Sequence, residues 1–96
     1  MSRKAIQFVD KPYHEKKIKG GFIRIFDEHV KEDSLIWHRD KRDRKIEVLK
    51  NEGWKIQLDN ELPIELKENE TYEITAMEYH RLIKGIGPLK LKIQEL

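Results

Sequence analysis

Three segments of this chain alternate apolar and polar residues with a period of two. The apolar members are Trp54, Ile56 and Leu58 in the first segment, Leu62, Ile64 and Leu66 in the second, and Leu89, Leu91 and Ile93 in the third. Successive side chains of a β-strand point to opposite faces, so this spacing predicts strands with one buried face. Weaker patterns predict further strands at residues 22–30, 34–39, 44–50, 72–76 and 79–84. No segment has helical spacing of apolar residues over three turns, although residues 26–34 are compatible with a short helical turn.

Turn-forming residues separate these segments. Glycine, asparagine, aspartate and proline occur at residues 50–53, 59–61, 67–70 and 85–88, where they permit positive φ or fix φ. Short strands with such turns predict an all-β fold, an antiparallel sandwich or barrel of about eight strands. The interior is expected to contain Ile36, Ile46, Val48, Trp54, Ile56, Leu58, Ile74, Leu82, Leu91 and Ile93.

The length of the chain limits its organisation. Ninety-six residues are enough for one domain. Residues 22–96 are expected to form the barrel, and residues 1–21 an N-terminal strand or arm. Within that arm, residues 10–21 are basic and end in a glycine pair, which favours a solvated arm or loop.

Charge and cysteine content exclude several classes of function. The chain has 20 Lys and Arg against 18 Asp and Glu, with the signs interspersed, so no nucleic-acid partner is expected. It has no cysteine, which excludes disulfides and thiolate zinc sites and fits a reducing compartment. Its apolar runs are too short for a signal sequence or a membrane span. We therefore predict a soluble cytoplasmic protein without a membrane partner.

Two histidines and one aspartate fall on strand faces that are otherwise apolar. His38 and Asp40 are two residues apart and share a face, His80 shares one with Leu82, and Arg44 begins the strand at residues 44–50. Neutral imidazole nitrogens and carboxylate oxygens bind Zn, Mn, Fe or Ni, and two histidines with one carboxylate occur in non-haem iron oxygenases. These residues are therefore a candidate site for a divalent metal.

The order and spacing of these residues resemble the cupin family over residues 22–93. Its first motif is HxH, three or four residues, Glu, six residues and Gly, and the corresponding positions here are His38-Arg39-Asp40, Arg44 and Asn51. Its second motif is Gly, five residues, PxG, two residues, His, three residues and Asn, and the corresponding positions are Asn69, residues 75–77, His80 and Lys84. The resemblance implies a small antiparallel double-stranded β-helix, also called a jelly-roll barrel.

Two positions depart from the cupin pattern. Cupins usually hold a metal with three histidines and a glutamate, but here Asp40 replaces the second histidine and Arg44 replaces the glutamate. The resemblance therefore implies His38, Asp40 and His80 as the remaining ligands, because a guanidinium stays protonated and does not ligate. In an alternative interpretation, Arg44 replaces the metal and pairs with Asp40. In another, both histidines are polar residues bonded to backbone inside a narrow barrel.

The sequence is compatible with three functions. A small metal-dependent isomerase or dioxygenase would use the three ligands, with Arg44 orienting an anionic substrate. A metal-free binding module would use Arg44 and Gln57 to hold a small polar or anionic molecule, such as an anion or a sugar. A structural scaffold would form a homodimer through its edge strands, as the resemblance to small cupins implies. The sequence identifies no activated nucleophile and no phosphate-binding loop, so no catalytic residue is predicted.

Overall fold

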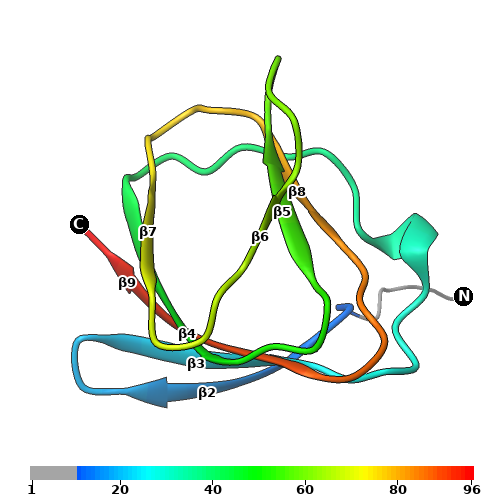
Figure 1. The fold of residues 1–96 in the computed structure, drawn as a ribbon. Helices are drawn as coiled ribbons and strands as arrows, with labels where there is room; N and C mark the ends of the chain where they lie inside the picture. Colours follow the sequence, from blue (N-terminus) through cyan, green and yellow to red (C-terminus); the bar gives the residue numbers. More distant parts are fainter. Residues whose placement is uncertain (1–10) are drawn as a thin grey trace, which may run out of the picture.

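The computed structural model describes residues 11–96, in which the chain forms eight strands and one 3-10 turn (Figure 1). Residues 1–10 of the predicted N-terminal arm lie outside the described residues. The elements are β2 (His14–Ile18), β3 (Gly21–Phe26), η1 (Glu32–Ser34), β4 (Arg44–Lys50), β5 (Lys55–Leu58), β6 (Ile64–Glu65), β7 (Thr71–Ile74), β8 (His80–Ile83) and β9 (Leu89–Glu95). The prediction of an all-β fold with about eight strands is confirmed.

The strands form two antiparallel sheets that face a common interior (Figure 1). One sheet has the order β2-β3-β9-β4-β7 and the other has the order β6-β5-β8. The chain passes from one sheet to the other between β4 and β5, between β6 and β7, between β7 and β8 and again between β8 and β9. From β6 to β9, strands that follow one another in sequence therefore lie in opposite sheets, as in a jelly-roll barrel.

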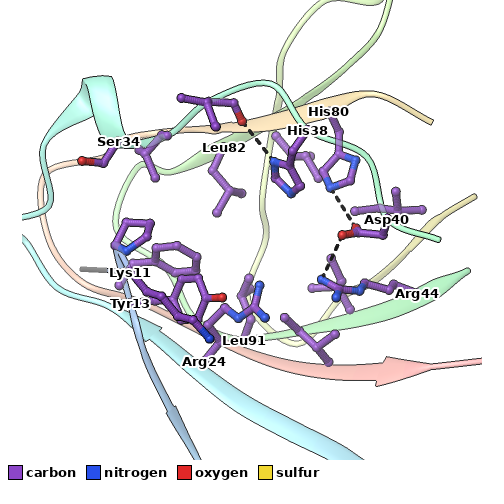
Figure 2. Close-up of a pocket in the computed structure, with 18 residues that line it drawn as sticks. Lys11, Tyr13, Arg24, Ser34, His38, Asp40, Arg44, His80, Leu82 and Leu91 are labelled. Atoms are coloured by element: carbon purple, nitrogen blue, oxygen red, sulfur yellow. Dashed lines mark hydrogen bonds and ion pairs between the residues drawn. The ribbon is translucent and has the colours of Figure 1, made fainter. Parts of the chain in front are cut away.

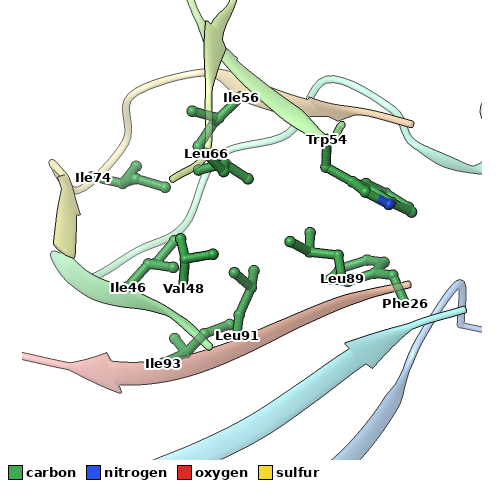
Figure 3. Close-up of a cluster of buried hydrophobic side chains, with 10 residues drawn as sticks. All are labelled: Phe26, Ile46, Val48, Trp54, Ile56, Leu66, Ile74, Leu89, Leu91 and Ile93. Atoms are coloured by element: carbon green, nitrogen blue, oxygen red, sulfur yellow. The ribbon is translucent and has the colours of Figure 1, made fainter. Parts of the chain in front are cut away.

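The two-residue alternation places the core as expected. In β4 and β9, Ile46 lies opposite Ile93 and Val48 lies opposite Leu91, and all four side chains are buried. The buried hydrophobic residues of the described chain are Phe26, Ile46, Val48, Trp54, Ile56, Leu66, Ile74, Leu89, Leu91 and Ile93 (Figure 3). Each fully buried aliphatic side chain contributes about 1.5–3 kcal/mol relative to an exposed one. Leu58 and Leu82 pack against this core but remain partly accessible.

The expectation that Ile36 lies in the interior is wrong, because its side chain is 65% exposed. The predicted strand at residues 34–39 does not form. Ser34 ends the short η1 turn instead, and the segment meets β8 through a single bridge between His38 and His80. Without a paired strand there is no pleat to direct alternate side chains inward, so the alternation rule does not apply to Ile36.

The interpretation of residues 10–21 as a solvated loop is also wrong for residues 14–18. These residues form β2, which pairs antiparallel with β3 and is one of the two edge strands of the larger sheet, as described for residues 11–96. Gly20 makes the intervening turn with φ +82°, a conformation that side-chain-bearing residues rarely adopt. Across the hairpin, the Arg24 guanidinium pairs with the Glu15 carboxylate at 2.8 Å.

Asn51 stabilises the turn that leads from β4 to β5. Its side-chain oxygen accepts a hydrogen bond of 2.8 Å from the Trp54 backbone N–H, and its amide donates to the Leu66 carbonyl. Gly53 completes the turn with φ +85°. This turn therefore holds the chain at its crossing between the two sheets. In the part of the chain that the structure describes, no helix is long and apolar enough to cross a membrane.

Candidate metal centre

The backbone brings His38 and His80 together. The His38 N–H donates to the His80 carbonyl at 3.0 Å, and the His80 N–H donates to the His38 carbonyl at 2.9 Å. The two ring centroids are consequently only 4.3 Å apart. A second backbone bond, from the Met77 N–H to the Asp40 carbonyl at 2.7 Å, ties the segment after His38 to the segment before β8. Asp40 is thereby held beside the histidine pair.

The three predicted ligands converge at one end of a cavity (Figure 2). One donor atom from each of His38, Asp40 and His80 lies within 4.8 Å of the other two. Within this group, the His80 Nε2 lies 3.3 Å from the Asp40 Oδ2. The convergence expected from the spacing of these residues is therefore confirmed, and the donor set fits a borderline divalent metal.

Hydrogen bonds to backbone determine which nitrogen of each imidazole is free. The His38 Nδ1 lies 3.0 Å from the Ile36 carbonyl, and the His80 Nδ1 lies 2.9 Å from the Glu78 carbonyl. A carbonyl only accepts, so each Nδ1 holds the proton and each Nε2 of a neutral ring presents a lone pair. Burial lowers the pKa of His80 below its ordinary value of 6.5, although the bond to Glu78 acts in the opposite direction. His80 is thus neutral at pH 7 and suited to ligation.

One carboxylate oxygen at this site lacks a donor. The Asp40 Oδ2 is buried and has no hydrogen-bond partner among residues 11–96. It faces the Nε2 of His80, which presents a lone pair rather than a proton when Nδ1 is the donor to Glu78. A buried acceptor without a donor costs about 1–3 kcal/mol, and more when it is charged. A cation between the oxygen and the nitrogen would satisfy both.

Arg44 lies beside Asp40 but does not supply the missing donor. Its Nη1 is 3.6 Å from the Asp40 Oδ1, which is too long for a hydrogen bond. Its Nη2 donates instead to the Glu95 carboxylate at 3.2 Å, across the β4–β9 pair. Its Nε is buried without an acceptor among the described residues. The guanidinium therefore adds positive charge to the site while one of its donors stays free.

The structure does not bring Gln57 to this cavity. Gln57 follows the buried Ile56 on β5, so the strand directs its side chain to the opposite face. Its carbonyl oxygen accepts a hydrogen bond of 2.9 Å from the Arg81 Nε, and its amide donates to the Glu61 carbonyl at 3.0 Å. The sequence-based assignment of Gln57 to ligand binding thus finds no support in its position.

The cavity has a volume of about 540 Å³ and extends from the metal ligands to the β2–β3 hairpin. Lys11, Tyr13 and Arg24 line its far end, opposite the histidines in Figure 2. Sequence reasoning missed these three residues for two reasons. It placed Lys11 and Tyr13 on a solvated arm, and it did not predict the β2–β3 hairpin on which Arg24 lies. The alternation signal that reveals a half-buried strand is weak in β2, whose first four residues are all exposed.

Comparison with known proteins identifies the fold. No protein-family model matches the chain, and no curated protein sequence matches it. Among solved structures, one of two DMSP lyases solved together has a TM-score of 0.65 at 14% identity, covering 77% of this chain and 36% of the lyase. A cupin-2 domain protein from Shewanella frigidimarina has a TM-score of 0.61 at 17% identity, covering 88% of this chain and 81% of that one.

A cupin protein from Bacteroides fragilis has a TM-score of 0.57 at 18% identity, covering 96% of this chain and 82% of that one. The chain thus spans most of the small cupins it matches but about a third of the lyase. At these identities the likeness concerns the fold, which is that of a small cupin. This confirms the fold implied by the spacing of His38, Asp40, Arg44 and His80.

Proposed function

We propose that the protein binds a divalent metal, Zn, Mn, Fe or Ni, through the Nε2 atoms of His38 and His80 and a carboxylate oxygen of Asp40. A small polar or anionic molecule would occupy the adjoining cavity. The observation that supports this proposal is the buried Asp40 Oδ2, which has no hydrogen-bond donor within residues 11–96 and lies 3.3 Å from the Nε2 of His80. A metal ion provides the positive charge that these two electron-pair donors need.

The residues around the site favour an anionic ligand. Three protein ligands leave coordination positions open, and a metal bound there acts as a Lewis acid toward a ligand oxygen. The Arg44 guanidinium lies on the same side, and its buried Nε lacks an acceptor among residues 11–96. Two adjacent positive groups repel each other unless an anion lies between them. Arg44 would therefore orient a negatively charged group beside the metal. An isomerase or dioxygenase would use this arrangement to hold an anionic substrate.

A metal-free binding module is the second candidate. It is favoured by the approach of Arg44 to Asp40, whose charged groups lie 3.6 Å apart with both side chains 15% exposed. In this case Arg44 would neutralise Asp40 and bind the anion directly. The missing donor at the Asp40 Oδ2 argues against it, because the guanidinium does not reach that oxygen.

Calorimetric titration of Ni²⁺ into untagged, chelator-treated protein tests the metal site. We expect one ion per chain, and at least tenfold weaker binding in Asp40→Asn and in His80→Ala, since each removes one of three ligands. Asp59→Asn and His29→Ala are matched controls, because both residues are exposed and lie outside the cavity. Absence of binding in the wild type, or equal binding in Asp40→Asn and Asp59→Asn, would contradict the proposal.

We also propose that the protein forms a homodimer through the strands that precede Val30. β2 is an edge strand of the larger sheet among residues 11–96, and an edge strand presents backbone groups that a second copy can pair with. Light scattering at high micromolar concentration measures the mass directly. We expect about twice the 11.6 kDa of one chain, and a strict monomer would refute the dimer.

We further place the protein in the cytoplasm. The chain contains no cysteine, so no disulfide stabilises it and it does not require an oxidising compartment. Immunodetection after cell fractionation measures the location. Protein found in a membrane or secreted fraction would contradict this assignment.

A further inference from the structure

The polar side chains that line the cavity gather at its two ends. His38, Asp40, Arg44 and His80 form one end, and Lys11, Arg24 and Ser34 lie toward the other (Figure 2). The wall between them is aliphatic. It is made by Ile46, Ile56, Ile74, Leu82, Leu91 and Ile93, which come from both sheets. A ligand that extends from the metal ligands into this cavity therefore meets hydrocarbon along its length.

This aliphatic wall offers no hydrogen bonds to a polar ligand body. Ile46, Ile56, Ile74, Leu91 and Ile93 are each at most 6% exposed, so the wall has little contact with bulk water. A sugar hydroxyl placed against it would lose its hydrogen bonds to water without replacement, at about 1–3 kcal/mol for each group. An apolar body gains about 0.8 kcal/mol for each buried methylene group. The wall thus favours hydrocarbon over polyols.

The arginines at the two ends of the cavity differ in whether a buried guanidinium donor lacks an acceptor within residues 11–96. At the far end, the Arg24 guanidinium donates to Glu15 through Nε and Nη2 at 3.0 and 2.8 Å. It also stacks on the Tyr13 ring, 3.9 Å from its centroid. At the near end, the buried Arg44 Nε has no acceptor among the described residues. The Arg44 Nε can therefore donate to an anionic group, and the Tyr13 ring held by Arg24 lines the far end.

We propose that the ligand of this cavity is a small monocarboxylate with an apolar body. Its carboxylate lies beside Arg44 and the three metal ligands, and its hydrocarbon part lies along the aliphatic wall toward Tyr13. The inference rests on the proposed function for the place of the carboxylate. The apolar wall is present whether or not a metal is bound. Experiments can therefore contradict the metal site and the apolar ligand independently of each other.

Binding of a homologous series tests the inference. Acetate, butanoate and hexanoate are titrated calorimetrically into both Zn²⁺-loaded and metal-free protein, together with 1-hexanol and glucose 6-phosphate. Burial of about 0.8 kcal/mol per methylene corresponds to roughly a fourfold gain in affinity for each. Hexanoate has four more methylenes than acetate, so we expect it to bind about 200-fold more tightly. We expect 1-hexanol and glucose 6-phosphate to bind at least tenfold more weakly than hexanoate.

The affinities in this series decide whether the ligand is a monocarboxylate with an apolar body. A rise in affinity from acetate to hexanoate in either state of the protein supports the inference. If the rise occurs in protein that binds no metal, the metal proposal fails while the inference holds. Equal affinities for acetate and hexanoate in both states would overturn it, as would tighter binding of glucose 6-phosphate than of hexanoate. Normal metal binding in that case would leave the metal proposal intact.

Leu82→Phe locates the binding within the cavity. Leu82 projects into its middle, between the histidines and Tyr13 (Figure 2), so a larger ring there shortens the space for a chain. We expect hexanoate affinity to fall at least tenfold while acetate and metal affinities change less than twofold. Leu62→Phe is the matched control, because Leu62 is 85% exposed and outside the cavity. An equal loss of hexanoate binding in both variants would count against the inference.

A second variant covers the case in which Leu82→Phe does not fold. Tyr13→Ala removes the ring that lines the far end, while the metal ligands at the near end are untouched. We expect the affinity ratio of octanoate to hexanoate to rise at least threefold over that of the wild type. An unchanged ratio would show that the chain does not extend toward Tyr13 and would overturn the proposed orientation.

Discussion

Replacing Arg44 with glutamate is expected to raise the affinity of the site for Ni²⁺ by well over tenfold. The change removes a positive charge that lies 3.6 Å from Asp40 and adds a carboxylate at the position where the cupin pattern has one. A charge change of this kind is worth on the order of several kcal/mol before desolvation is subtracted. Calorimetric titration of wild type and variant under the same conditions measures the difference.

Two matched variants separate this effect from a general change in charge. Arg44→Gln removes the positive charge without adding a carboxylate, so we expect an intermediate affinity. Arg42→Glu makes the same charge change at an exposed residue outside the cavity, so we expect an affinity close to that of the wild type. Equal absence of binding in wild type and Arg44→Glu would end the metal hypothesis and leave the binding-module or scaffold function.

The free energy of unfolding of Arg44→Ala tests whether Arg44 serves mainly to neutralise Asp40. If Arg44 mainly neutralises Asp40, its loss should cost about 3 kcal/mol or more, because a buried carboxylate would be left unpaired. The structure favours a smaller cost. The hydrogen bond of Arg44 goes to Glu95, whose side chain is 41% exposed, and the Asp40 Oδ2 already lacks a donor in the described part of the chain. Chemical unfolding of metal-free wild type and Arg44→Ala measures this difference in the free energy of unfolding.

The strands that have one buried face could be predicted from the sequence. β4 and β9 alternate apolar and polar residues because one face of each meets the core, and their bounds closely match the expected segments. β2 lacks this signal. Its first four residues, from His14 to Lys17, are all exposed, so the sequence shows charge rather than alternation. Pairing with β3 and the turn at Gly20 define this strand instead.

The site could be predicted in part from the spacing of its residues, although the strand expected at residues 34–39 does not form. The spacing of His38, Asp40 and His80 followed the cupin motifs, and the structure brings their donor atoms within 4.8 Å. Gln57 was assigned to the pocket although its neighbour Ile56 points inward, and strict use of the alternation would have excluded it. Arg24 reaches the cavity through the β2–β3 hairpin, a contact between distant residues that no local pattern reports.

Trp54 is expected to contribute more to stability than any exposed aromatic residue of the chain. Its side chain is 0% exposed, and its ring centroid lies 5.5 Å from that of Phe26 (Figure 3). Its indole N–H donates to the Gly87 carbonyl at 2.6 Å, which links the start of β5 to the turn before β9. Truncation would therefore leave a cavity and an unpaired carbonyl at the same place.

Trp54→Ala is expected to lower the free energy of unfolding by about 3–5 kcal/mol, which is a large part of the roughly 5–15 kcal/mol that stabilises a domain. Trp54→Phe keeps an aromatic ring but loses the bond to Gly87, so we expect a smaller loss of about 1–3 kcal/mol. Trp37→Ala is the control, because Trp37 is 41% exposed, and should cost less than about 1 kcal/mol. Urea unfolding followed by circular dichroism measures all three. If Trp54→Ala proved as stable as Trp37→Ala, the barrel would not depend on this contact between the two sheets.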